Sequence, residues 1–109
     1  MKLTNMPFET TDWAAVDAVE HHGERGLATW RTVQHGDLRI RIVDYTPGYI
    51  ADHWCRKGHV VYCLTGELVT ELRDGRRFVV KPGMSYQVAD GETPHRSSTA
   101  AGARVFIVD

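Results

Sequence analysis

Short apolar or alternating segments, separated by turn residues, dominate the chain. Residues 38–45 (LRIRIVDY) alternate well enough for a half-buried strand and end at Thr46-Pro47-Gly48. Residues 59–64 are an apolar strand that ends at Thr65-Gly66. The same pattern predicts strands over 68–73, 76–81, 84–88, 95–99 and 104–108, and Asp74-Gly75 predicts a two-residue hairpin turn between two of them. Regular short strands with Gly and Pro turns favour an all-β sandwich or barrel.

The beginning of the chain has a different pattern. Residues 11–20 start with residues that can cap a helix, and Trp13 and Val16 recur at helical spacing. We therefore expect a short N-terminal helix in an extension, residues 1–34, that also supplies an edge strand packed on the barrel. Residues 35–109 would form the barrel itself, and the whole would be one structural domain.

Length and charge restrict the function. A chain of 109 residues fits one domain with a real core. The net charge is -1, with 13 basic and 14 acidic residues and no run of like charges, which argues against a nucleic-acid partner. No apolar segment approaches the roughly 20 residues of a membrane span, and the N-terminus lacks a secretory signal. We expect a cytoplasmic protein with no membrane partner.

Histidine and cysteine stand at spacings that could close one metal site. The segment His53-x-Cys55-x3-His59 is interpreted as a β-hairpin, with residues 56–58 in the turn. Such a hairpin would set His59 directly opposite Cys55 and place His53 on the same face. His95, which follows a proline, is the candidate for the fourth donor.

The two cysteines are not expected to form a disulfide. In the predicted hairpin, Cys63 would lie about 13 Å along the strand from the partner of Cys55, beyond the Cα separation that a disulfide spans. Cys63 lies in an apolar run and is interpreted as core packing. Cys55 is either a small buried residue or a thiolate ligand.

Two stretches resemble the motifs of the cupin family. Residues 48–66 are similar to the first motif, in which a Gly precedes a His-x-His pair, a Glu and a second Gly. Residues 83–95 are similar to the second motif, with its Gly-Asp and Pro-His ends. The segment Asp52-His53-Trp54-Cys55 resembles that of a group of small cupins named for an Asp-His-Cys-Trp (DHCW) motif. The resemblance implies a cupin-type jelly-roll β-barrel.

Carried over residue by residue, the resemblance implies a metal site with an altered ligand set. His53 and His95 match metal-binding His positions, Cys55 takes the second His position, and His59 takes the Glu position. Three imidazoles and a thiolate favour zinc, with iron, copper or nickel as alternatives. The missing carboxylate removes any step in which the family's Glu acts as a ligand or base.

Two classes of function follow from this interpretation. The first is a metalloenzyme that acts on a small organic molecule in the barrel. The second is a non-enzymatic binding or sensing protein, with a structural metal or a metal-free ligand pocket. Because small cupins are commonly dimers, we also expect a homodimer, and the segment 3–8 could add to a partner's sheet edge. A resemblance in fold names no reaction.

Other polar and aromatic residues leave alternatives open. Arg39 and Arg41 share one strand face, which either lines the barrel as an anion-binding surface or faces solvent. The tyrosines Tyr45, Tyr49 and Tyr86 are candidates for pocket walls, core or interface. The remaining histidines match no motif position and are expected to be exposed: His21, His22 and His35.

Overall fold

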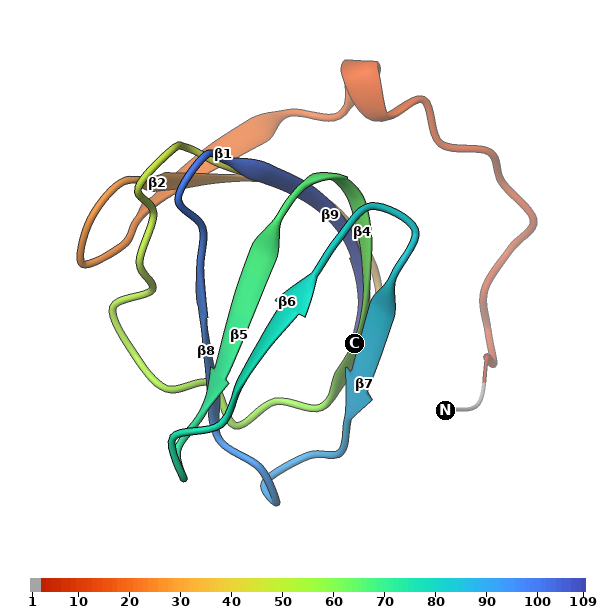
Figure 1. Cartoon of the computed structure of the whole chain (residues 1–109). Coiled ribbons are helices and arrows are strands. Elements are labelled where there is room, and N and C mark those ends of the chain that lie inside the picture. Colours follow the sequence, from red (N-terminus) through yellow and green to blue (C-terminus); the bar gives the residue numbers. More distant parts are fainter. Residues whose placement is uncertain (1–2) are drawn as a thin grey trace.

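The computed structural model describes residues 3–109, and within this range nine strands form two antiparallel sheets. One sheet has the strand order β1-β2-β3-β9-β4-β7 and the other the order β6-β5-β8. Figure 1 shows the two sheets curving round a common interior. The all-β prediction is confirmed, as a sandwich of two antiparallel sheets. The strands are β1 (Ala18–His22), β2 (Leu27–His35), β3 (Leu38–Tyr45), β4 (His59–Gly66), β5 (Leu68–Leu72), β6 (Arg77–Val80), β7 (Ser85–Val88), β8 (His95–Ser98) and β9 (Ala103–Val108).

The strands predicted over 38–45, 59–64 and from residue 68 onward all form, with ends that differ by at most two residues. Before residue 38 the structure has two strands, β1 and β2, where the sequence predicted an edge strand without stated bounds. β2 pairs with β3 along its length, from Ala28 opposite Tyr45 to His35 opposite Leu38. It therefore belongs to the large sheet and crosses the boundary expected at residue 35. Residues 1–2 of the expected extension lie outside the described range.

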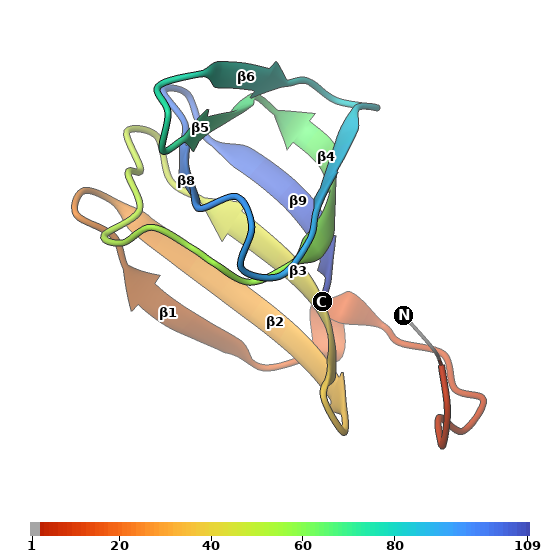
Figure 2. The same ribbon diagram turned by 90° about the horizontal axis from the view of Figure 1, so that it is seen from below.

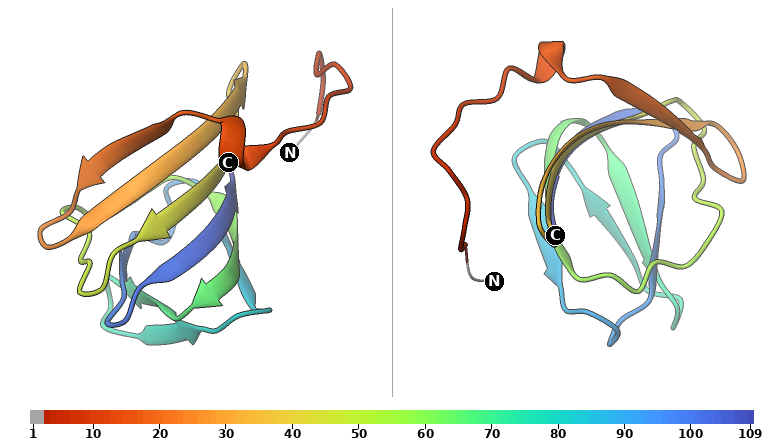
Figure 3. Two further views of the ribbon diagram at one scale, coloured as in Figure 1. Left: turned by 90° about the horizontal axis from the view of Figure 1, so that it is seen from above. Right: turned by 180° about the vertical axis from the view of Figure 1, so that it is seen from behind.

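The predicted N-terminal helix is wrong. Within residues 3–20 only one 3-10 turn forms, η1 (Trp13–Ala15), and the Asp12 carboxylate caps it by accepting from the Ala14 N–H at 3.2 Å. At Val16 the chain becomes extended, and residues 18–22 pair with β2 as strand β1. Residues 18–22 satisfy their backbone hydrogen bonds by pairing with β2, and all five side chains stay exposed. Figure 3 shows η1 on the outside of the large sheet.

No helix among residues 3–109 is both long and apolar enough to span a membrane.

The core lies between the two sheets, which face each other in Figure 2. Strand alternation decides which side chains reach it. On β9, Ala103, Val105 and Ile107 are buried, while the residues between them are partly exposed. On β4, Val61 and Cys63 are buried in the same way, which confirms the prediction that Cys63 is core packing. Neither cysteine of the described chain forms a disulfide.

The hairpin between β5 and β6 is tight, but its loop has three residues rather than the predicted two. The Gly75 N–H donates to the Leu72 carbonyl at 3.0 Å, and the Leu72 N–H donates to the Arg76 carbonyl at 2.8 Å. Gly75 has a φ of 97°, in the left-handed region, and the Asp74 carboxylate accepts from the Arg76 N–H at 3.0 Å. A three-residue loop that ends on such a glycine is a common hairpin connection.

Two glycines with positive φ provide a matched test of the fold. A Cβ at Gly75 would meet nothing within 4 Å, whereas a Cβ at Gly66 would lie 2.1 Å from the Gly102 carbonyl oxygen. Gly75→Ala should therefore lower the free energy of unfolding by about 1–2 kcal/mol through backbone strain alone. Gly66→Ala adds a steric clash and should cost about 2–5 kcal/mol. Urea unfolding of both variants measures the two losses in the free energy of unfolding. Equal losses would contradict the close approach of Gly66 to the Gly102 backbone.

Candidate metal centre

Three of the four predicted donors, Cys55, His59 and His95, lie close together, but their segments pair differently from the prediction. Residues 51–58 form no hairpin. Instead, Cys55 makes an isolated antiparallel bridge with His95: the Cys55 N–H donates to the His95 carbonyl at 2.7 Å, and the His95 N–H donates to the Cys55 carbonyl at 3.0 Å. His59 begins β4, opposite Val88 of β7. The predicted pairing of Cys55 with His59 is therefore wrong, because residues 51–58 cross from one sheet to the other.

Close packing at Gly58 explains why the chain crosses rather than turns back. The Gly58 N–H donates to the Asp90 carboxylate, and a Cβ at Gly58 would lie 2.6 Å from the Asp90 nitrogen. Only glycine allows the two backbones to approach this closely. The contact holds the start of β4 against the loop that precedes β8, and so brings His59 towards His95.

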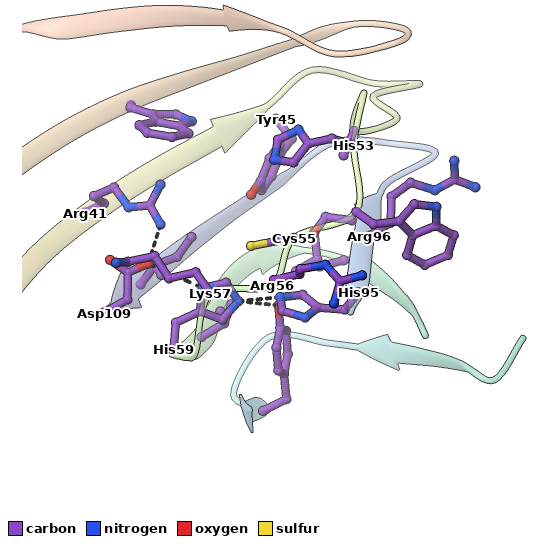
Figure 4. Close-up of a pocket in the computed structure, with 18 of the residues that line it drawn as sticks. Arg41, Tyr45, His53, Cys55, Arg56, Lys57, His59, His95, Arg96 and Asp109 are labelled. Carbon is purple, nitrogen blue, oxygen red and sulfur yellow. Dashed lines mark hydrogen bonds and ion pairs between the residues drawn. The ribbon is translucent and has the colours of Figure 1, made fainter. Parts of the chain in front are cut away.

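Cys55, His59 and His95 form a compact donor cluster. Their ligand atoms all lie within 4.8 Å of one another, and the Nε2 atoms of the two histidines are 2.8 Å apart. His95 is only 2% exposed. Figure 4 shows the three side chains converging at one side of a pocket. A cluster of one thiol and two imidazoles with this separation could close round a single metal ion, whose bonds to such donors measure about 2.0–2.3 Å.

The outer ring nitrogens of both histidines have acceptors. Nδ1 of His95 is 2.9 Å from the Thr93 carbonyl, and Nδ1 of His59 is 3.4 Å from a carboxylate oxygen of Asp109. In the tautomer in which each Nδ1 carries the proton, both Nε2 lone pairs face the same point. Ligating histidines in metal sites are oriented by outer partners of this kind. A proton or a metal ion between the two Nε2 atoms relieves the repulsion of their lone pairs.

The electrostatic surroundings favour the ligand forms of His59 and Cys55, whereas the raised pKa of His95 opposes its neutral form. Burial and the neighbouring His95 lower the pKa of His59 to about 4, although Asp109 opposes the shift. His59 is therefore neutral at pH 7. A hydrogen bond with His95 lowers the pKa of the Cys55 thiol, against the effect of burial, and the same contact raises the pKa of His95. A neutral imidazole and a thiolate are the ligand forms of these residues.

His53, the other donor predicted from the sequence, lies outside this cluster. Its side chain is 73% exposed, and its Nδ1 lies 2.6 Å from the carboxylate of the adjacent Asp52. It stands at the edge of the same pocket, as Figure 4 shows. The structure thus brings together three of the four predicted donors and places the fourth at the pocket rim.

The cluster opens onto a cavity of about 470 Å³, a volume typical of small-molecule sites. Aromatic side chains form much of its wall, and the three candidate tyrosines are among them: Trp30, Tyr45, Tyr49, Trp54 and Tyr86. Burial raises the pKa of Tyr86 to about 12 and that of Tyr45 further, so both phenols stay protonated and can donate hydrogen bonds. Of the remaining histidines, His21 and His22 are exposed as predicted, whereas His35 is partly buried and lies 2.6 Å from Glu9.

Arg39 and Arg41 face the interior, which decides between the two alternatives left open by the sequence. Arg41 is only 5% exposed, and its Nη2 donates to Asp109 at 2.9 Å. Arg39 binds the same carboxylate through Nε and Nη2, at 2.8 and 3.1 Å. The Asp109 side chain is fully buried; burial alone would raise its pKa, but the two guanidinium groups hold that pKa below its usual value.

Sequence reasoning missed Asp109. A signal exists in the chain, because two arginines on one inward strand face require a carboxylate nearby. The partner cannot be named from the sequence, however, since Asp109 reaches Arg39 only through the pairing of β3 with β9 and is 70 positions away.

Comparisons with known proteins identify the fold. The sequence matches no protein-family model and no curated protein. Solved structures do match: the polyketide cyclase RemF from Streptomyces resistomycificus is 24% identical, with 94% of this chain and 78% of that chain covered and a TM-score of 0.76. Fe(II)-HppE with an alternative substrate is 12% identical, with 94% of this chain and 60% of that chain covered and a TM-score of 0.75. A sugar phosphate isomerase from a cupin superfamily, SPO2919 of Silicibacter pomeroyi, is 14% identical, with 92% of this chain and 74% of that chain covered and a TM-score of 0.71.

At these identities the likeness shows the fold alone. The chain has the fold of cupin-superfamily proteins, as the motifs in residues 48–66 and 83–95 predicted. The resemblance to the DHCW group stays a prediction.

The buried ion pairs of Asp109 generate a stability prediction. Asp109→Asn removes the charge that balances Arg39 and Arg41 in the interior, so the free energy of unfolding should fall by about 3–5 kcal/mol. The matched control is Asp44→Asn, because Asp44 also contacts two arginines, at 3.6 and 3.5 Å, but is 41% exposed. That change should cost about 1 kcal/mol or less. Denaturant unfolding compares the two variants, and similar losses would show that burial of the Asp109 cluster contributes little.

Proposed function

We propose that this chain is a metal-binding cupin-fold protein in which Cys55, His59 and His95 hold one divalent metal ion beside a small-molecule pocket. The observation that carries the proposal is the convergence of these three donors within 4.8 Å at the wall of a cavity. The outer acceptors at Asp109 and Thr93, and the lowered pKa values of His59 and Cys55, support it.

The donor set bears on the identity of the metal. One thiolate and two imidazoles favour zinc, with iron, copper or nickel as alternatives, and disfavour ions that prefer oxygen ligands. The likeness to Fe(II)-HppE supports iron as the first alternative. We retain zinc as the favoured metal on the chemistry of the donors.

Three protein donors leave a coordination position for water or substrate, which is the arrangement of catalytic metals. We therefore propose a metalloenzyme that acts on a small organic molecule. A metal held there would polarise a substrate or activate a water molecule. Among the residues of the chain, Asp109 orients His59, and the protonated Tyr45 and Tyr86 donate hydrogen bonds to a bound molecule.

The alternative is a non-enzymatic binding or sensing protein, with a metal-free ligand pocket or a closed four-ligand structural metal. His53 would have to leave Asp52 and turn inward to complete that set, and it lies only two residues from Cys55. The contribution of His53 to metal binding therefore separates the two functions.

Metal content after purification without added metal tests the ligand set. We expect about one ion per wild-type chain. Cys55→Ser, His59→Gln and His95→Gln should each lose it, whereas His53→Ala should retain it if the site has three protein donors. His35→Gln is the control, because His35 contacts Glu9 and does not line the pocket. Elemental analysis of samples whose thermal unfolding confirms folding gives the result, and full occupancy in His95→Gln would remove His95 from the set.

Cobalt substitution tests independently whether the Cys55 thiolate binds the metal. A thiolate bound to Co(II) produces an intense sulfur-to-metal band in the near ultraviolet, and binding releases the thiol proton. The band should disappear in Cys55→Ser and persist in Cys63→Ser, whose side chain is buried in the core. A band that survives Cys55→Ser would leave a site of nitrogen donors only.

We further propose, as the sequence predicts, that the protein is cytoplasmic and related to the DHCW group. We also propose that it forms a homodimer. The outer face of β4 supports the dimer, because Val60, Tyr62 and Leu64 on it are 43%, 41% and 38% exposed. Neighbouring exposed apolar residues of this kind often mark an interface. Light scattering should give twice the chain mass for the wild type and the monomer mass for Tyr62→Lys. Thr29→Lys, on β2 of the same sheet, serves as the control, and a wild-type monomer would refute the proposal.

A further inference from the structure

We propose that the ligand of this pocket is a small organic carboxylate whose anionic group binds at Arg41 and Tyr45, with the rest of the molecule directed at the Cys55, His59 and His95 cluster. The inference rests on the proposed function, because it names the ligand class of the same pocket.

The first support is the charge of the cavity wall. Among the described residues that line it, five side chains carry a permanent positive charge and only Asp109 carries a permanent negative one. Of the five, Arg56 and Lys57 are exposed on the segment 51–58, at the mouth of the pocket. A cavity lined by one sign of charge attracts ligands of the other sign. The positive residues are Arg39, Arg41, Arg56, Lys57 and Arg96.

The second support is the unused hydrogen-bonding capacity of Arg41. Its guanidinium lies over the Trp30 ring, 4.3 Å from the centroid, and donates from Nη2 to Asp109. Its Nε is buried and finds no hydrogen-bond partner among residues 3–109. A guanidinium offers five N–H donors in a planar fork, and a buried donor without an acceptor is unfavourable. Because Nε has almost no accessible surface, a ligand reaches it only if the Arg41 side chain shifts, whereas the guanidinium as a whole lines the pocket and can receive a carboxylate.

The local charge balance favours a carboxylate over a phosphate. Arg39, Arg41 and Asp109 together carry one net positive charge, which a carboxylate neutralises and a phosphate dianion exceeds. Of the other pocket cations, Arg96 is already bound to Glu71 at 2.9 Å, and Arg56 and Lys57 are exposed to solvent. Tyr45 follows Arg41 on the same inward face of β3, and Figure 4 shows it projecting into the pocket beside Cys55. Its hydroxyl can therefore donate to the same ligand group.

The orientation of the ligand follows from Asp109. A single oxygen of this carboxylate, Oδ2, contacts both Arg41 Nη2 and His59 Nδ1. The anion site and the donor cluster are therefore neighbours on one wall. A carboxylate held at Arg41 directs its carbon skeleton along the aromatic wall, past the cluster.

The experiment uses metal-free protein, so that it does not depend on the metal. Acetate, propionate and benzoate are titrated, each against its neutral amide, and the Arg41 Nε–H and Trp30 indole N–H signals are followed by NMR. We expect saturable shifts with at least one acid and at least tenfold weaker binding of its amide, because the amide lacks the charge that the guanidinium recognises. Inorganic phosphate should bind at least tenfold more weakly than the best acid.

Variants locate the binding. Arg41→Lys keeps the charge but loses the fork, and should weaken the best acid about tenfold. Arg77→Lys, at an exposed position on β6, should change nothing. If Arg41→Lys does not fold, Tyr45→Phe replaces it as the decisive variant and should weaken the acid several-fold.

Several results would overturn the inference: no saturable shift with any acid, an amide that binds as tightly as its acid, phosphate that binds more tightly, or affinity unchanged in the folded Arg41 or Tyr45 variant. Repetition with metal-loaded protein separates the two proposals. Carboxylate binding without metal uptake would refute the metal site alone, and metal uptake without carboxylate binding would refute this inference alone.

Discussion

The fully buried carboxylate of Asp109 is the contact on which the interior of this sandwich depends. It binds Arg39 and Arg41, whose charges would be strongly unfavourable between two sheets without it. It also accepts from Nδ1 of His59, which directs Nε2 of that ring towards Cys55 and His95. One residue therefore offsets part of the charge of Arg39 and Arg41 and orients His59, a proposed metal ligand. For both reasons the site requires the register in which β9 pairs with β3 and β4.

The donor cluster also connects the two sheets. His95 begins β8 of the small sheet and is bridged to Cys55, while His59 begins β4 of the large sheet. The distance between the donors is therefore set by how the sheets pack, with Gly58 against Asp90 as the nearest fixed contact. A metal ion bound at this point would join the two sheets, so metal binding and stability of the fold should be coupled.

The pocket combines two kinds of recognition at neighbouring positions. The proposed metal ligands Cys55, His59 and His95 line the same pocket as the cationic hydrogen-bond donor Arg41, together with aromatic rings and core residues. Ligand sites commonly combine an apolar wall with a few well-placed polar groups. Asp109 keeps the two ends distinct, because it absorbs one of the two arginine charges and leaves the other for a ligand.

The sequence by itself determined the strands from β3 to β9, because alternation and Gly or Pro turns are local signals. Through motifs with fixed spacing it also proposed four candidate donors, of which the structure brings Cys55, His59 and His95 together and leaves His53 at the rim. Tertiary structure decided the rest. Residues 18–20, the end of the predicted helix, became part of strand β1 because β2 offered them hydrogen bonds. Cys55 met His95 rather than His59, and Asp109 met Arg39, because both contacts arise from pairing between distant segments. Local sequence patterns carry no information on which distant backbones will pair, so the partners of these residues could be known only from the folded chain.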